Sequence, residues 1–175
     1  MQKAVFFDRD DTLIVNIPYN GDPDRVELLP GAQEACRQLK RQKYSLFIIS
    51  NQSGVGRGLI TPEQVKAVND RVLELLGDDI ISDVFCCFDL PDDSPDCRKP
   101  SNKMICSAAE KYNIDLSRSF MIGDKPSDIQ AGINAGCAAI FITGGADTKA
   151  PISADFVTDN LLSAAAWIIS QKGDE

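Results

Sequence analysis

The sequence predicts an α/β protein, a doubly wound three-layer α/β/α sandwich built on a mainly parallel sheet. Short runs that are apolar throughout alternate along the chain with segments of helical periodicity. This alternation is typical of a parallel sheet that helices cover on both faces, and right-handed crossovers make it doubly wound. Chemically reactive side chains also stand where several of the apolar runs end. Such sheets bind ligands beyond the carboxyl ends of their strands, so we expect one functional site there.

The composition indicates a single domain over residues 1–175. A length of 175 residues and a hydrophobic content of 43% are sufficient for one core. The net charge of −8 disfavours nucleic acid or an anionic membrane as a partner. Because no apolar run is long enough to span a bilayer and no signal peptide precedes the first strand, we expect a cytoplasmic protein.

The cysteine and histidine content limits the chemistry. In the cytoplasm the six cysteines are expected to be reduced thiols and not a disulfide framework. The chain has no histidine, which excludes Ser-His-Asp and Cys-His catalysis and any zinc site that needs imidazole. Proton transfer must therefore fall to Asp, Glu, Lys, Tyr or Cys.

Breakers and capping residues mark the elements of the first half of the chain. Pro18 and Pro23 lie in the first loop, Pro30 opens the first helix, and Thr61 and Pro62 are suited to the N-cap and N1 positions of the second helix. The expected elements are, in order, a strand over 3–7, a loop over 13–29, a helix over 30–42, a strand over 44–50, a loop of small residues over 51–58 and a helix over 62–76.

The second half continues the alternation of apolar strands and helices. The expected elements are a strand over 83–88, a polar loop over 89–100, a helix over 101–112, a strand over 119–122, a short helix over 129–135, strands over 138–142 and 155–157, and a helix over 160–170.

Two carboxylates follow the first strand, Asp8 and Asp10. Side chains two residues apart in an extended segment point the same way, so these two can converge. Neighbouring carboxylates repel, and a divalent cation such as Mg²⁺ relieves that repulsion. One of them could also be a nucleophile that accepts a phosphoryl group. The alternative is an ordinary turn rich in aspartate.

Three further polar residues are expected at the carboxyl ends of other strands: Ser50, Lys99 and Asp124. Each alone could be an ordinary residue of a turn or loop. Their common placement, in an order that brings them to one edge of the sheet, favours a shared active site.

These motifs together resemble those of the haloacid dehalogenase superfamily of phosphotransferases. The matching segments are Asp8-Arg9-Asp10-Asp11-Thr12, Ser50, Lys99, and Gly123-Asp124 with Asp128. Ser50-Asn51-Gln52-Ser53-Gly54, Cys97-Arg98-Lys99-Pro100 and Gly123-Asp124-Lys125 are similar to the capless branch of that superfamily, in a resemblance that spans about residues 3–142. The branch includes phosphatases of D-glycero-D-manno-heptose 1,7-bisphosphate and of histidinol phosphate.

The resemblance implies a role for each catalytic residue. Asp8 would be the nucleophile, and Asp10 would protonate the leaving alkoxide and then activate water. Ser50, with backbone N–H groups near Asn51, would hold the phosphoryl oxygens, and Lys99 would offset charge on the group in transfer.

The resemblance also implies a Mg²⁺ site. Asp8, the backbone carbonyl of Asp10, and Asp124 would hold the ion. Asp128 would orient this shell from behind or cap the following helix.

The substrate would enter an open cleft, because the spacing of the motifs leaves no room for a cap domain. Selectivity would come from the loops 16–19, 52–58 and 89–98. Arg98 is the best candidate for gripping a second anionic group, since its guanidinium pairs bidentately with phosphate, although it could instead be a solvated loop arginine. The full set of candidate substrate-binding residues is Asn16, Tyr19, Asn51, Gln52, Ser53, Arg98 and Lys125.

The chain departs from the branch pattern in two places. Asp11 replaces the usual glycine, and aspartate tolerates unusual backbone angles well enough for the turn to survive. Relatives bind structural zinc through four ligands, of which only Cys87 and Cys97 remain here, so we expect no zinc.

The expected activity is Mg²⁺-dependent hydrolysis of a phosphate monoester on a small phosphorylated sugar, through an aspartyl-phosphate. The resemblance favours heptose 1,7-bisphosphate, a lipopolysaccharide precursor in carbohydrate metabolism, converted to heptose 1-phosphate by a monomeric enzyme. The alternatives are a histidinol-phosphate phosphatase or a broad sugar phosphatase. A phosphoacceptor signalling domain ranks low, because its phosphorylated aspartate would end the central strand and that position is not acidic here.

Overall fold

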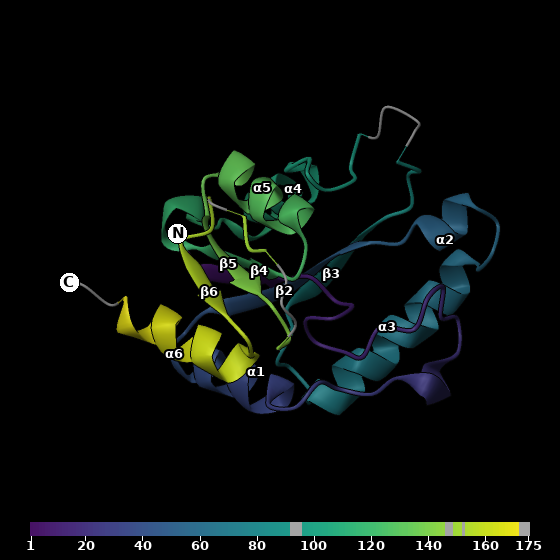
Figure 1. Ribbon diagram of the computed structural model, residues 1–175, viewed down its shortest axis with the longest axis horizontal. Helices are drawn as coiled ribbons and strands as arrows, with labels where there is room; N and C mark the ends of the chain where they lie inside the picture. The colour runs from purple at the N-terminus through teal and green to yellow at the C-terminus, as the bar shows by residue number, and fades with distance from the viewer. Residues whose placement is uncertain (92–95, 146–148, 152, 172–175) are drawn as a thin grey trace.

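A parallel sheet forms the centre of the computed structural model, which describes residues 1–91, 96–145, 149–151 and 153–171 (Figure 1). Its strands are β1 (Ala4–Phe7), β2 (Ser45–Asn51), β3 (Asp83–Cys87), β4 (Phe120–Gly123), β5 (Ala138–Ile142) and β6 (Phe156–Thr158). They run in the order β3-β2-β1-β4-β5-β6, and every neighbouring pair is parallel. The order reverses at β1, which confirms the predicted doubly wound fold.

Helices cover both faces of the sheet. They are α1 (Ala32–Arg41), α2 (Ser53–Gly56), α3 (Pro62–Leu76), α4 (Lys103–Tyr112), α5 (Pro126–Ala135) and α6 (Leu161–Ser170), with 3₁₀ turns at Pro23–Arg25 and Leu116–Arg118. Side chains of α1, α3 and α6 pack in one core cluster, and those of α4 and α5 pack in another on the opposite face (Figure 1).

Strand β1 is apolar throughout because helices cover both of its faces. Val5 and Phe7 belong to the cluster with α1, α3 and α6, whereas Ala4 and Phe6 belong to the cluster with α4 and α5. All four are fully buried. Because side chains alternate between the faces of a strand, a strand with two covered faces cannot alternate apolar with polar residues.

Capping residues explain where α3 and α5 begin, at or near their predicted first residues. α3 begins at Pro62 with Thr61 as N-cap, and Thr61 and Gln64 form a reciprocal capping box. α5 begins earlier than expected, at Pro126, because the Asp128 carboxylate accepts the N–H of Lys125 and caps the first turn.

Two other differences concern the predicted loops. The segment 51–58 contains the single helical turn α2, where we expected only loop. In the loop 13–29, Ile14 pairs with Leu28 in an isolated antiparallel bridge. Of the loop 89–100, residues 92–95 lie outside the described residues.

The expectation of six reduced cysteines is wrong for Cys87 and Cys97, which form a disulfide. The loop after β3 folds back until their Cα atoms are 5.6 Å apart, a separation that suits such a bond. Cys36, Cys86, Cys106 and Cys137 are free. Asp89 lies beside the disulfide, and its carboxylate accepts the N–H groups of Asp96 and Cys97. The absence of structural zinc stays a prediction.

Within the described ranges, every helix is too short or too polar to cross a membrane.

Candidate active site

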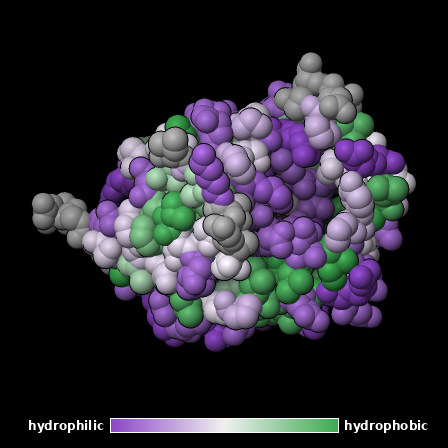
Figure 2. All heavy atoms as spheres, in the orientation of Figure 1, coloured by the Kyte–Doolittle hydropathy of each residue, from purple (hydrophilic) through white to green (hydrophobic). Residues whose placement is uncertain are grey.

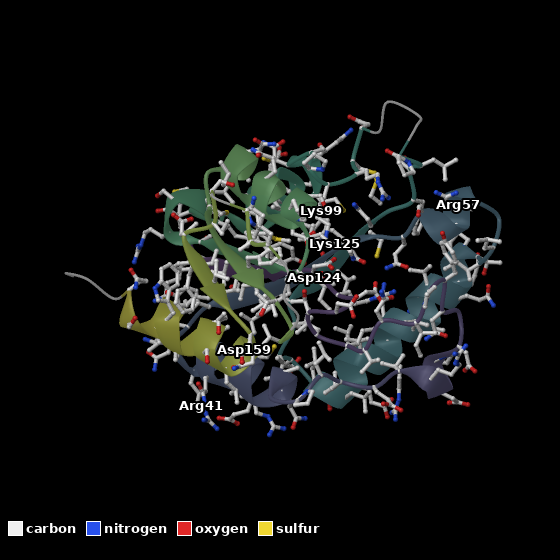
Figure 3. The ribbon with its side chains drawn as sticks, in the orientation of Figure 1. Arg41, Arg57, Lys99, Asp124, Lys125 and Asp159 are labelled. Atoms are coloured by element: carbon white, nitrogen blue, oxygen red, sulfur yellow. A yellow bond between two sulfur atoms is a disulfide. The ribbon has the colours of Figure 1, made fainter. Side chains whose placement is uncertain are left out.

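The predicted catalytic residues gather at the carboxyl edge of the sheet. Asp8 directly follows β1, Ser50 is the penultimate residue of β2, and Asp124 directly follows β4. These three strands are neighbours, so the side chains meet. Lys99 does not stand at a strand end as expected, because it comes from the far end of the loop between β3 and α4. Figure 3 shows Lys99, Asp124 and Lys125 at this edge, where the surface in Figure 2 is largely hydrophilic.

Lys99 links two carboxylates inside the protein. Its Nζ lies 2.6 Å from Asp8 Oδ1 and 2.7 Å from Asp128 Oδ1, and it donates to the carbonyl of Ile49 at 2.8 Å. The side chain is 2% exposed. Burial alone would lower the pKa of Lys99, but the charges of Asp8 and Asp128 outweigh burial and raise it. The ammonium therefore stays charged.

Asp8 is held in its ionised form. Burial would raise the pKa of Asp8, but the charge and hydrogen bond of Lys99, aided by Lys125, outweigh burial and lower it. An ionised carboxylate at this position is able to act as a nucleophile.

The arrangement fits a divalent cation. Asp8, Asp124 and Asp128 each offer a carboxylate oxygen, and these oxygens lie within 4.8 Å of one another. Asp124 Oδ1 is buried and has no hydrogen-bond partner among the described residues. Burial, then the charge of Asp8, raise the pKa of Asp124 to about 7. Oxygen ligands and surplus negative charge are what Mg²⁺ binds.

Asp128 makes a contact that fits each of the two roles considered for it, of which the helix cap is confirmed and the orienting role stays a prediction. It caps α5 through the Lys125 N–H and pairs with Lys99 of the site. Its side chain packs against Gly123, where an added Cβ would lie 2.3 Å from the Asp128 side chain. Glycine before Asp124 is therefore required for this close approach.

Asn51 and Gln52 bind other site residues through their side chains. Asn51 Oδ1 accepts the Lys99 N–H at 3.0 Å, and its Nδ2 donates to the Lys99 carbonyl at 3.3 Å. Gln52 Nε2 donates to Ser50 Oγ at 2.8 Å and to Asp10 Oδ2 at 2.9 Å. Both amides hold catalytic candidates in place.

The remaining substrate-binding candidates surround the site. Arg98 is partly buried, and its Nη1 is buried without a hydrogen-bond partner in the described part of the chain. Lys125 is exposed, with Nζ 3.7 Å from Asp124 Oδ2. Ser53 begins α2 and is partly buried.

The loop after β1 carries the other two candidates. Asp11 has φ 61°, which bears out its tolerance of the conformation that glycine usually supplies. Asn16 Nδ2 donates to the Asp11 carboxylate at 2.9 Å. Tyr19 is exposed and packs against Gly54 of α2.

The sequence analysis missed Asn69 of α3, which accepts a hydrogen bond from Arg9 Nη1 at 2.8 Å. Asn69 is buried on the same helix face as Val65, Val68 and Val72. A polar residue on this apolar face was the signal that could have identified it.

A cavity of about 870 Å³ lies at the opposite, amino edge of the sheet, with Lys3, Tyr44 and Arg118 in its lining. None of the catalytic candidates lines it. The chemistry of the carboxyl edge, and not cavity size, identifies the candidate site.

Sequence comparisons agree with the geometry. A family model described as haloacid dehalogenase-like hydrolase matches residues 19–136. D-glycero-beta-D-manno-heptose-1,7-bisphosphate 7-phosphatase of Yersinia pestis is 34% identical, with 98% of this chain and 92% of the relative covered. The protein of the same name from Escherichia coli strain K12 is 35% identical over 97% of this chain and 95% of the relative.

Solved structures are similar over nearly the whole chain. D,D-heptose 1,7-bisphosphate phosphatase of B. bronchiseptica, in complex with magnesium and phosphate, has a TM-score of 0.85 and 28% identity, covering 97% of this chain and 99% of that one. A HAD-like phosphatase of Mesorhizobium loti has a TM-score of 0.83 and 30% identity, covering 99% and 88%.

The raised pKa of Asp124 predicts a pH-dependent cost in the metal-free protein. An acid whose folded pKa is about 7, against an ordinary 3.8, destabilises the fold progressively as pH rises between those values. Asp124→Asn should therefore be more stable than the parent at pH 8 without metal, by about 2–4 °C in Tm for each kcal/mol recovered. Thermal melts in EDTA at pH 4.5 and pH 8 measure this, and the gain should shrink at the lower pH.

Asp159→Asn is the matched control, since the exposed Asp159 follows β6 and the substitution removes the same charge (Figure 3). Adding Mg²⁺ at pH 8 should stabilise the parent more than Asp124→Asn. An equal gain from Asp159→Asn would attribute the effect to net charge and contradict the prediction.

Proposed function

The chain belongs to the haloacid dehalogenase-like hydrolases, and from this premise we propose that it is a Mg²⁺-dependent phosphatase of heptose 1,7-bisphosphate with Asp8 as its nucleophile. The observation that carries the proposal is the buried ion pair of Asp8 with Lys99 beside two more carboxylates. An ionised nucleophile, a fixed cation and a site for Mg²⁺ are the parts that phosphoryl transfer to a carboxylate requires.

In the first half-reaction an Asp8 oxygen forms a bond to phosphorus, and the bond from phosphorus to the sugar oxygen breaks. Asp10 gives its proton to that departing oxygen. The products of this step are the free sugar hydroxyl and a phosphoryl group on Asp8.

In the second half-reaction Asp10, now ionised, takes a proton from water as the water oxygen bonds to phosphorus. The bond from phosphorus to Asp8 breaks, which releases inorganic phosphate and restores both carboxyl groups to their starting states. The second half-reaction thus returns to Asp10 the proton that the first one used.

The cations of the site lower the barrier in both steps. Lys99 stands where charge builds on the phosphoryl oxygens, and Ser50 Oγ lies at the same edge to bind them. Mg²⁺, held by Asp8, Asp124 and the backbone carbonyl of Asp10, would neutralise the repulsion between the carboxylate and the phosphate.

The heptose substrate is inferred from the relatives and from Arg98. The relatives that share 34–35% identity with nearly all of this chain are named as 7-phosphatases of that sugar bisphosphate. The phosphate that stays on the product needs a cation. Arg98, which precedes Lys99 in the sequence, has a buried Nη1 with no hydrogen-bond partner among the residues that the structure describes. We assign Arg98 to this second phosphate, with Lys125 and Tyr19 at the rim of the cleft.

Asp8→Asn should abolish phosphate release, because an amide cannot accept the phosphoryl group. Asp10→Asn should lower kcat by about 10²–10⁴-fold, because it removes the group that transfers the proton. Phosphate release from heptose 1,7-bisphosphate with Mg²⁺ measures both. Retention of activity within about tenfold by a folded Asp8→Asn protein would refute the nucleophile assignment.

Chelation should stop the activity reversibly, because three neighbouring carboxylates need a cation before an anionic substrate can bind. The assay is phosphate release in EDTA and again after excess Mg²⁺.

Elemental analysis should find far less than one zinc per chain. Stoichiometric zinc lost together in Cys87→Ser and Cys97→Ser proteins would show that a structural zinc had been wrongly dismissed.

Arg98→Ala should lower kcat/KM for the bisphosphate by about 10–150-fold, as expected for loss of a charged hydrogen bond of about 1.5–3 kcal/mol. An aryl phosphate without a second anion should lose much less. Lys99→Ala should damage both substrates alike, because Lys99 acts on the group in transfer.

Arg41→Ala is the matched control, since the Arg41 side chain is 69% exposed and lies away from the site (Figure 3). It removes one positive charge from the protein and should leave both substrates unchanged. If Arg98→Ala affects the two substrates equally, the bisphosphate assignment fails and a broad sugar phosphatase is the better description.

A further inference from the structure

Arg9 is buried between the two aspartates of the first motif. It is 2% exposed, although arginine is seldom buried without partners. Its guanidinium faces the carboxylate of Asp10, with Nε 3.2 Å from Oδ2 and Nη2 3.2 Å from Oδ1. The side-by-side arrangement of two N–H donors on two carboxylate oxygens fixes the plane of the carboxylate as well as its position.

A third donor completes the restraint on Asp10. Gln52 Nε2 donates to Asp10 Oδ2 at 2.9 Å and is itself held against Ser50 Oγ. The Asp10 side chain remains 18% exposed, so substrate and water can reach it. Its carboxylate is not part of the group that Asp8, Asp124 and Asp128 form around the metal position.

Arg9 is in turn oriented by α3. Its Nη1 donates to Asn69 Oδ1 at 2.8 Å, and Asn69 Nδ2 contacts Cys86 Sγ of β3 at 3.4 Å. Asn69 is 8% exposed on a helix face that otherwise packs in the core. A buried amide costs free energy that an apolar residue there would avoid, and its hydrogen bond to Arg9 offsets this cost.

We propose that Asn69 and Arg9 are positioning residues that aim the Asp10 carboxylate at the leaving oxygen of the substrate. This inference rests on the proposed function, in which Asp10 supplies the proton. Proton transfer requires the donor within hydrogen-bond reach of its target, and small displacements are costly to the rate. Without the guanidinium, Asp10 would keep the Gln52 amide as a restraint but lose the paired donors that fix the plane of its carboxyl group, and it could then turn away from the leaving oxygen.

A leaving-group comparison separates positioning from simple structural support. An alkyl phosphate such as the heptose bisphosphate needs a proton on its departing oxygen, whereas p-nitrophenyl phosphate releases p-nitrophenolate, a stable anion that leaves without a proton. The measurement is kcat/KM, because this quantity reflects only the steps up to phosphoryl transfer to Asp8. The later hydrolysis of the phosphorylated Asp8 is the same for both substrates and does not enter it. Asn69→Leu, of similar volume but without an acceptor for Arg9, is the main variant.

The expected result is a loss of about tenfold or more on the alkyl phosphate, a part of the 10²–10⁴ that proton transfer supplies, with little loss on p-nitrophenyl phosphate. Asn69→Asp, which restores an oxygen acceptor for Arg9, should recover most of the activity. Arg9→Lys, which keeps the charge but not the paired donors, should show the same selective loss and serves if Asn69→Leu does not fold.

Equal losses on the two substrates, or none, in folded Asn69→Leu and Arg9→Lys proteins would overturn the inference. Asp10→Asn distinguishes this failure from failure of the proposed function. If Asp10→Asn also lacks a selective loss on the alkyl phosphate, the acid role of Asp10 is itself refuted. If Asp10→Asn shows the selective loss and the other variants do not, only the positioning roles of Arg9 and Asn69 are refuted.

Discussion

The contact of the Lys99 ammonium with Asp8 and Asp128 is the interaction on which the rest of the site depends. It joins a residue after β1, a residue of α5 and a loop beyond β3 through two short ion pairs in the interior. Burying a lone charge is very costly, so each of these three groups is tolerable only because the others are present. The surrounding fold serves this balance: Gly123 leaves space for Asp128, and Asn51 holds the Lys99 backbone.

The positive and negative charges of this site do not cancel. One ammonium faces three carboxylates, and the surplus raises the pKa of Asp124 to about 7 and leaves its Oδ1 without a hydrogen-bond partner among the described residues. A divalent cation would relieve both. Positive charge also gathers at this edge of the sheet, where Lys99 and Lys125 lie (Figure 3), although the chain as a whole carries −8. These cations suit an anionic phosphate.

A second set of polar residues does no bond making in the proposed mechanism. Gln52 and Asn69 act on Ser50, Arg9 and Asp10 through side-chain amides. Amides suit this work because they donate and accept without titrating. The proposed proton donor, Asp10, is thereby connected through Arg9 to Asn69 of α3. This helix is long and capped, and its other buried residues pack in the core. Rigid elements thus position the side chains that loops alone would leave mobile.

The sequence by itself determined the elements, their order and the candidate nucleophile, because apolar periodicity, breakers and caps are local signals. It located Asp8, Ser50 and Asp124, since parallel topology brings the strand ends together, whereas Lys99 reaches the same edge from a loop and not from a strand end. Only the tertiary structure decided that the Asp128 carboxylate, and not that of Asp10, joins Asp8 and Asp124 in a cluster that could hold a metal. It also decided that Arg9 turns to Asp10 and that Cys87 meets Cys97. These outcomes depend on rotamers and on loops folding back across the sheet. Contacts between residues far apart in the sequence leave no periodic pattern in it, so only the packing of the folded chain determines which of these side chains meet.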